Sequence, residues 1–191
     1  MLPEYQSLSQ AEQQLAKWIV LFHDIEKIHI RGKRDFIHGF RSAVTAAKAL
    51  GNLGFPTTNK FNDTIAAWSE LTNSAITNNT NMGEQIQDNS KLPAIISGIE
   101  ILYGQNTPAA LVIKGVLLHM SINVVKDWPQ TAPITDAEIV RYVNADLAPL
   151  LKAMNLADSE GWSMFYQETR AIQRSETLEE FKRIEEIISN Q

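Results

Sequence analysis

The stretch Ser9-Gln-Ala-Glu-Gln-Gln-Leu-Ala-Lys-Trp-Ile-Val-Leu-Phe-His-Asp24 predicts an amphipathic helix with a defined start. Its first four residues have the pattern of a capping box, in which the side chains of Ser9 and Glu12 each accept a hydrogen bond from the other residue's backbone N–H. Apolar side chains then recur every three or four residues: Leu15, Trp18, Ile19 and Phe22. Because this spacing places them on one face, we expect the helix to pack against a core.

The rest of the chain continues the helical pattern and lacks the alternation of strands and turns. Helix starts are marked by Thr107-Pro108 and by a second capping box, Thr135-Asp-Ala-Glu138. We expect helices over residues 37–53, 61–71, 92–103, 107–122, 135–154, 159–173 and 178–188. The isoleucine-rich segment 92–103 also permits a buried strand. Residues 77–90, which are rich in Asn, Gln, Gly and Thr, are expected to form a polar loop, the best candidate for a lid or an insertion.

Composition indicates one folded domain of 191 residues, with 44% hydrophobic and 20% charged residues. We expect a single all-α bundle, with a core over residues 9–154 and a helical extension over residues 159–189. The formal charge of −5, without a run of Lys and Arg, argues against extended nucleic acid as a partner. The absence of cysteine excludes disulfides and thiolate chemistry. No signal or membrane-spanning segment is found, so we expect a cytoplasmic protein without a membrane partner.

Three polar residues interrupt the apolar stripes: His23, His119 and Asp146. Each follows an apolar residue of its own stripe by three or four positions, so each is expected to face the interior. A buried carboxylate costs several kcal/mol unless it is paired or binds a metal, so Asp146 needs a partner. Taken singly, each residue is more simply a hydrogen-bonded core residue or one at the edge of a stripe. Together they predict one shared polar site.

Two motifs join these residues: Leu21-Phe-His23-Asp24-Ile-Glu-Lys27 and Asp35-Phe-Ile-His38-Gly39-Phe-Arg-Ser42-Ala43. They resemble the HD superfamily of metal-dependent phosphohydrolases, in which an apolar helix ends in His-Asp and a His-Gly pair often opens the next helix. The resemblance covers residues 15–54 well and extends more loosely to the surroundings of His119 and Asp146. It implies an HD-domain-like helical bundle.

The resemblance also implies a divalent metal, for which Mn, Fe, Ni, Co, Zn and Mg are all candidates. The implied ligands are His23, Asp24, His38, His119 and Asp146, with His38 at the rim of the cleft. Imidazole and carboxylate ligands suit these ions. Two departures stand out: no His precedes His23 to supply the family's first ligand, and Glu26 replaces the usual glycine. The five residues would serve one or two ions, or else belong to a degenerate site.

For catalysis, the resemblance implies that Asp24 holds the metal and orients a water molecule, while Lys27 neutralises phosphate charge. Arg31 and Arg41 are further candidates for contacts with the substrate phosphate. The simpler interpretation of these cations is a solvated helix end, where positive charge complements the helix dipole.

The leading hypothesis is a metal-dependent phosphohydrolase that acts on a small phosphorylated molecule, with a nucleotide as the first candidate. The alternative is a catalytically silent HD-like helical module for ligand sensing or protein interaction, which the missing first His supports. A plain helical bundle is the third possibility. The last predicted helix carries an apolar stripe formed by Leu178, Phe181, Ile184 and Ile188. This stripe would pack either on the bundle or on the second subunit of a homo-oligomer. Metal content separates the first hypothesis from the other two.

Overall fold

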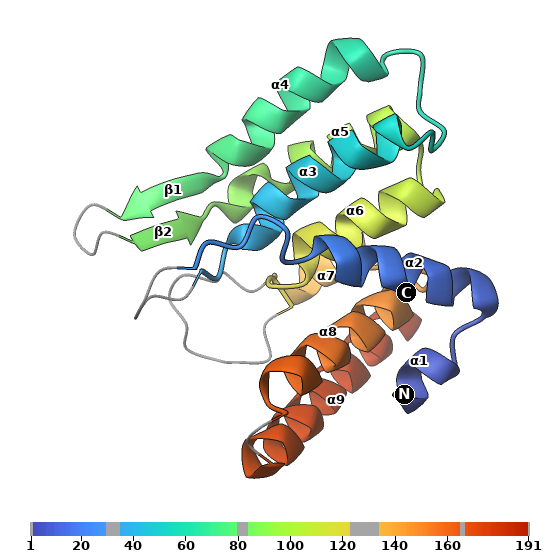
Figure 1. Cartoon of the computed structure of the whole chain (residues 1–191), viewed down its shortest axis with the longest axis vertical. Coiled ribbons are helices and arrows are strands. Elements are labelled where there is room, and N and C mark those ends of the chain that lie inside the picture. The colour runs from blue at the N-terminus through green and yellow to red at the C-terminus, as the bar shows by residue number, and fades with distance from the viewer. Residues whose placement is uncertain (1, 30–34, 80–83, 123–133, 165–166, 191) are drawn as a thin grey trace.

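The computed structural model describes residues 2–29, 35–79, 84–122, 134–164 and 167–190, which form an all-α bundle with one small β-hairpin (Figure 1). Its helices are α1 (Pro3–Gln6), α2 (Gln10–Phe22), α3 (His38–Asn52), α4 (Phe61–Ser74), α5 (Leu92–Tyr103), α6 (Pro108–Leu118), α7 (Asp136–Tyr142), α8 (Ala148–Trp162) and α9 (Gln167–Ser189). Strands β1 (Ile76–Asn79) and β2 (Glu84–Gln87) pair antiparallel, and a short 3-10 helix, η1 (Asn89–Lys91), follows them.

Helix α6 lies at the centre of the bundle and packs against α2, α3 and α5. Every residue from Ala109 to Leu118 is buried, as expected for a helix that is apolar on all sides. Its one charged residue, Lys114, donates from Nζ to Glu100 Oε1 of α5 at 2.7 Å, so the buried ammonium is paired.

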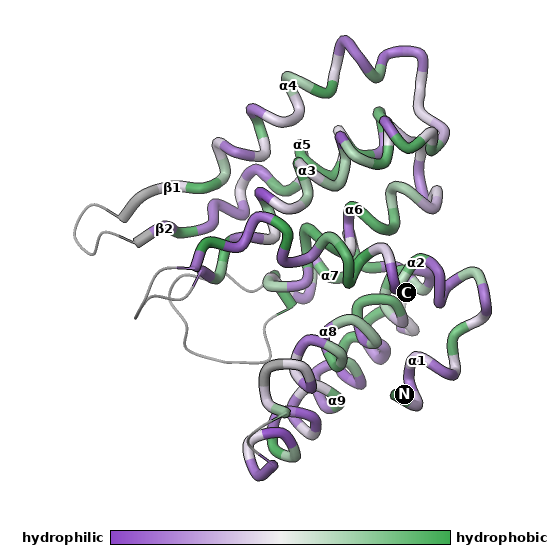
Figure 2. The backbone as a smooth tube through the Cα atoms, viewed as in Figure 1, coloured by the Kyte–Doolittle hydropathy of each residue, from purple (hydrophilic) through white to green (hydrophobic). Residues whose placement is uncertain are grey.

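The other helices lie on two sides of this centre. Figure 1 shows α3, α4 and α5 on one side and the α8–α9 pair on the other. Helix α2 joins the two sides, because it contacts both α3 and α8. Figure 2 shows hydrophilic residues concentrated on the outer turns of α8 and α9. In the described part of the chain, no helix combines the length and apolar character needed to cross a membrane.

Two glycines allow α2 and α3 to approach α6 closely. A Cβ atom on Gly115 of α6 would lie 2.6 Å from Ile19 Cδ1 of α2. A Cβ atom on Gly39, the second residue of α3, would lie 3.1 Å from the carbonyl oxygens of both Val116 and Leu117. The C-terminal end of α6 is therefore in close contact with the start of α3.

The all-α prediction is confirmed, and so are its local signals. The capping boxes at Ser9 and Thr135 are both formed, and the Thr107 hydroxyl accepts from the backbone N–H of Ala110 at the start of α6. The isoleucine-rich segment is helix α5 and not a strand.

The predicted boundaries are wrong in four places, the first of which is the helix expected over residues 107–122, because α6 ends at Leu118. Residues 76–79 and 84–87 form the hairpin instead of a loop, because pairing satisfies the backbone of a polar segment that cannot form an apolar helix face. The predicted helix over residues 135–154 is two helices, since Val143 takes extended backbone angles (φ −110°, ψ 105°). The last two helices are predicted over residues 159–173 and 178–188. Instead α8 continues to Trp162, and a single helix, α9, covers Gln167–Ser189 without a break, because it contains no Gly or Pro.

The contact between α2 and α6 leads to a prediction about stability. Replacing Gly115 by Ala should lower the free energy of unfolding by about 1–3 kcal/mol, because the new methyl group has to displace the fully buried Ile19. Gly161→Ala in α8 is the matched control: its Cβ would meet nothing within 4 Å, so higher helix propensity should stabilise the protein by up to about 1 kcal/mol. Denaturant unfolding of both variants tests this, and equal effects would contradict the proposed close contact.

Candidate metal centre

Three helix ends bring the candidate ligands together. His23 is the C-cap of α2 and is followed by Asp24, His38 is the first residue of α3, and His119 is the C-cap of α6. The packing of α2 and α3 against α6 places these ends side by side. His38 and His119 are only 1% and 2% exposed, so the sequence-based position of His38 at the rim is wrong, because the close approach of α3 buries its ring against His119.

The three imidazole rings are oriented by the same kind of hydrogen bond. Each Nδ1 bonds the carbonyl oxygen of the residue three positions earlier. For His23, His38 and His119 in turn, these oxygens belong to Val20 (2.7 Å), Asp35 (2.6 Å) and Val116 (2.7 Å). A carbonyl oxygen can only accept, so each Nδ1 carries the proton and each Nε2 is left for another partner. Histidines that bind metals through Nε2 are oriented in this way.

The Nε2 atoms converge with two carboxylates. His38 Nε2 lies 3.0 Å from His119 Nε2 and 2.8 Å from Asp24 Oδ1. His23 Nε2 lies 3.6 Å from Asp24 Oδ1 and 3.6 Å from Asp158 Oδ1 of α8. Two groups of ligand atoms result, each spanning no more than 4.8 Å: Asp24, His38 and His119 in one, and His23, Asp24 and Asp158 in the other. Asp24 belongs to both.

Two features of this geometry fit a cation. Asp24 Oδ1 is buried and lies 2.8 Å from His38 Nε2, so the two atoms need a proton or a cation between them. With both Nδ1 atoms protonated, the Nε2 lone pairs of His38 and His119 face each other at 3.0 Å, an arrangement that needs a proton or a cation between them. Imidazole nitrogen and carboxylate oxygen are ligands for Mn, Fe, Co, Ni and Zn.

The electrostatic environment shifts the pKa values of the candidate ligands in different directions. Burial, together with the neighbouring His38 and His23, lowers the pKa of His119, so this ring is neutral at neutral pH. Burial disfavours the charged form of His23, but the carboxylates of Asp158 and Asp24 outweigh it and raise the pKa of His23. Burial likewise opposes ionisation of Asp24, yet His38 and Lys27 hold the pKa of this carboxyl well below its ordinary value. Asp24 is therefore ionised.

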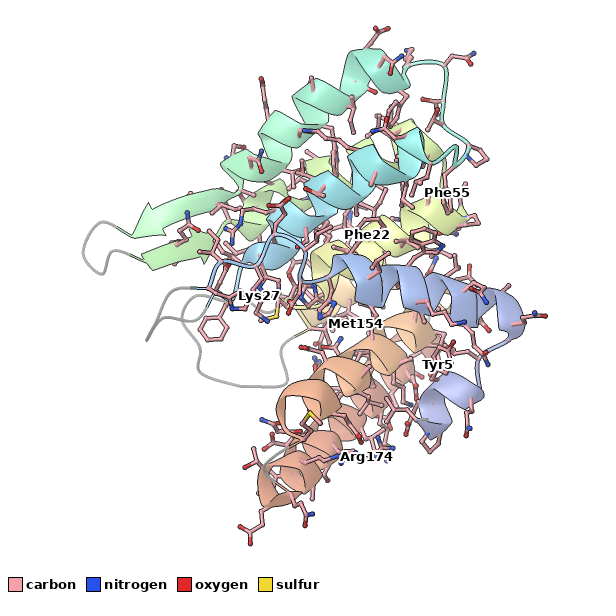
Figure 3. The ribbon with its side chains drawn as sticks, viewed as in Figure 1. Tyr5, Phe22, Lys27, Phe55, Met154 and Arg174 are labelled. Atoms are coloured by element: carbon pink, nitrogen blue, oxygen red, sulfur yellow. The ribbon has the colours of Figure 1, made fainter. Side chains whose placement is uncertain are left out.

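The structure does not place Asp146 among these donors. Asp146 is exposed in the turn between α7 and α8 and belongs to neither ligand group, because the helix on which its inward position depended ends before it. Asp158 is the carboxylate that the sequence analysis missed. It follows Leu150 and Met154 at intervals of four residues, so the apolar stripe of α8 could have identified it. Figure 3 shows Met154 at the junction of α2 and α8.

Among the described residues, Lys27 is a cation in direct contact with one of the candidate ligands, Asp24. It lies on the turn that follows α2, and its Nζ donates to Asp24 Oδ2 at 2.8 Å (Figure 3). Its side chain is 29% exposed, so it remains accessible to a small anion. Arg31 lies outside the described residues. His29, the one histidine of the four that is not among the candidate ligands, is exposed.

Arg41 is engaged with neighbouring protein groups. Its guanidinium is paired with the carboxylate of Asp35 and also donates to Gln85 Oε1 of β2 at 3.1 Å and to the carbonyl oxygen of Glu26 at 3.4 Å. With only 18% of its side chain exposed, Arg41 joins the turn after α2 to the hairpin.

Glu26, which stands where the motif that this segment resembles has glycine, holds the same turn against α3. Its Oε1 accepts from the Thr45 hydroxyl at 2.6 Å, and its backbone N–H donates to Ser42 Oγ at 3.3 Å. The departure from the motif therefore has a local structural role, which is to hold the turn that carries Asp24 against α3.

Comparison with protein-family models gives no match for this chain, and neither curated proteins nor solved structures match it. The likeness to HD phosphohydrolases rests on the motif residues, and the function has to be argued from the site itself.

The carboxylates around His23 lead to a prediction about its titration. In metal-free protein, Asp158→Asn should lower the pKa of His23 from its raised value towards or below about 6.5, because a carboxylate that stabilises the imidazolium is removed. Asp146→Asn, the matched control, should leave the pKa of His23 unchanged. NMR titration of the His23 ring measures both effects. An unchanged pKa in Asp158→Asn, or an equal fall in both variants, would contradict the arrangement described.

Proposed function

We propose that the chain is a metal-dependent phosphohydrolase that acts on a small phosphorylated molecule. The observation that supports this best is the convergence of three imidazole Nε2 atoms, each oriented through Nδ1, with the carboxylates of Asp24 and Asp158. A donor set of three nitrogens and two carboxylates is typical of transition-metal sites.

His38, His119 and Asp24 would hold one cation, and His23, Asp158 and Asp24 would hold a second. A divalent cation supplies Lewis acidity, which polarises a phosphoryl oxygen and acidifies a water molecule. Because Asp24 is common to both groups, its loss should affect metal binding most. The five donors come from α2, α3, α6 and α8 or from the turn after α2, so the site depends on the assembled bundle.

Lys27 would provide positive charge for the substrate. Its ammonium lies at Asp24 Oδ2, on the side of the carboxylate opposite to the oxygen that approaches His38 and His23. A phosphoryl group bound beside Asp24 would lie in the field of the Lys27 ammonium, whose charge would stabilise the negative charge of the transition state. Arg41 is a weaker candidate for this role because it is bound to Asp35. Arg31 stays a prediction from the sequence.

The substrate class beyond phosphate rests on the resemblance alone. The site supplies donors for a metal and a cation for a phosphoryl group, and a nucleotide is proposed because HD phosphohydrolases commonly act on nucleotides. The rival, a catalytically silent HD-like module, draws its support from the missing first His of the motif. The two hypotheses differ in turnover, so a measurement of hydrolysis separates them where metal binding alone does not.

Metal binding should stabilise the protein. Addition of Mn, Co or Ni at about 100 times its dissociation constant should raise the melting temperature by about 5–10 °C, since the ion binds the native state alone. His23→Gln should reduce or abolish this rise, whereas His29→Gln, the matched control at an exposed histidine, should retain it. Elemental analysis of protein purified without chelator provides a second measurement. Absence of bound metal and of any shift would favour the silent HD-like module, with a degenerate site, or the plain helical bundle over the phosphohydrolase.

Hydrolysis should depend on both metal and Lys27. With metal present, the protein should hydrolyse aryl phosphates or members of a nucleotide panel, and chelation should suppress the activity. Lys27→Ala should lower turnover by about 100-fold without changing metal content, because Lys27 contributes charge and not a metal ligand. Lys17→Ala, at an exposed lysine of α2, serves as the control and should be fully active. Metal binding without hydrolysis of any compound would favour the silent module.

A further inference from the structure

Each histidine ring of the candidate metal centre is oriented by a backbone carbonyl oxygen. The three carbonyl oxygens differ in what holds them in place. The acceptors for His23 and His119 are the carbonyls of Val20 and Val116, which lie within α2 and α6. The hydrogen-bond ladder of a helix holds such carbonyls in place. The acceptor for His38 is the carbonyl of Asp35, which lies before the start of α3. His38 therefore needs another structural support.

The Asp35 side chain supplies that support. Its Oδ1 accepts from the backbone N–H of Ile37 at 3.3 Å, and its Oδ2 accepts from the backbone N–H of Ile28 at 2.8 Å. Oδ2 is also paired with the guanidinium of Arg41. Only 9% of the side chain is exposed. One buried carboxylate thus joins the segment before α3 to the turn that carries Asp24 and to α3 itself.

Arg41 extends this arrangement to two other elements. It lies on α3, one turn after His38, so its distance from the His38 backbone is set by the helix. Its remaining donors reach Gln85 Oε1 of β2 and the carbonyl oxygen of Glu26. Asp35 is therefore held by a cation whose own position is fixed from three directions.

We infer that Asp35 is the positioning residue of His38: its carboxylate, paired with Arg41, fixes its own carbonyl oxygen as the acceptor for His38 Nδ1. Removal of the carboxylate leaves the Asp35 carbonyl free to rotate away, and the Nδ1–H bond that directs Nε2 towards Asp24 and His119 is lost. This inference deepens the proposed function, because Asp35 matters for catalysis only if His38 binds the metal. Its structural part is independent of metal.

The structural part is tested by NMR of metal-free protein with ¹⁵N-labelled histidine. Wild-type protein should show an Nδ1–H proton on each of His23, His38 and His119 that is protected from exchange. In Asp35→Ala, the protected proton of His38 should be lost while those of His23 and His119 remain. Asp88→Ala is the matched control, because Asp88 caps η1 through Ser90 N in a similar way but orients no histidine. It should leave all three protons protected.

The conservative variant Asp35→Asn retains the shape of the side chain and one acceptor oxygen. That oxygen can replace Oδ2, which bonds Ile28 and Arg41, or Oδ1, which bonds Ile37, but not both, and the negative charge that pairs with Arg41 is lost. In Asp35→Asn, the exchange rate of the His38 Nδ1 proton should lie between those of wild type and Asp35→Ala. A general loosening of the fold would change the exchange rates of all three rings and not of His38 alone. If Asp35→Ala does not fold, Asp35→Asn decides the matter. A His38 proton as protected in Asp35→Asn as in wild type, or unprotected in wild type itself, overturns the inference.

The functional part is tested by titration with Mn²⁺ or Co²⁺ alone. Asp35→Ala should weaken binding by about 10- to 100-fold, the usual effect of losing a group that orients a metal-binding histidine. Asp88→Ala should bind as wild type does. If wild-type protein binds neither ion, the proposed function fails while the NMR result still decides the role of Asp35. Loss of the His38 proton with unchanged metal affinity would overturn the link to metal binding.

Discussion

The packing of α2 and α3 against α6 is the interaction on which the rest of the structure depends. Helix α6 is apolar on all sides, so it is stable only when other helices cover it. Gly115 and Gly39 let the helices approach so closely that a methyl group at either position would have to displace neighbouring atoms. The same contact fixes the positions of three helix ends, and each of these ends carries a histidine. Core packing and site geometry are therefore set by one constraint.

The cluster at these helix ends is costly for a protein that only needs to fold. Five ionisable side chains share a small, partly buried volume, in which two imidazole nitrogens lie 3.0 Å apart and a carboxylate oxygen lies 2.8 Å from one of them. Desolvation of such groups is compensated only when their polar atoms are well paired. Elsewhere the buried charge is paired directly, as Lys114 is with Glu100. Departures of this kind from well-satisfied packing are concentrated at functional sites.

The described residues between α2 and α3, which are 23–29 and 35–37, are held by side-chain hydrogen bonds. Glu26 binds Thr45 and Ser42, and Asp35 binds the backbone of Ile28 and Ile37. Most of these bonds join a side chain to the backbone or to a hydroxyl of a neighbouring turn, so they replace the backbone hydrogen bonds that a helix would provide. Asp24 thus lies on irregular backbone that is nevertheless well connected, and His38 begins α3 beside it.

The sequence by itself determined the helical class, because periodicity and capping are local properties. The capping boxes at Ser9 and Thr135 formed as the pattern predicted. The sequence also placed His23, Asp24, His38 and His119 at helix ends or on inward faces, and the structure brings these four together. It could do so because each prediction depended on a motif or on a stripe that continues without a break.

Only the tertiary structure decided the remaining members of the site. Asp146 and Asp158 both follow apolar residues at helical spacing, but a break in the backbone at Val143 exposes the first, while α8 carries the second to His23. The sequence also could not show that Arg41 binds Asp35, Glu26 and Gln85, since these partners lie up to 44 residues away along the chain. Local patterns encode which face of a helix is buried. Which ligand meets which depends on how distant helices pack against α6, and that is a property of the whole chain.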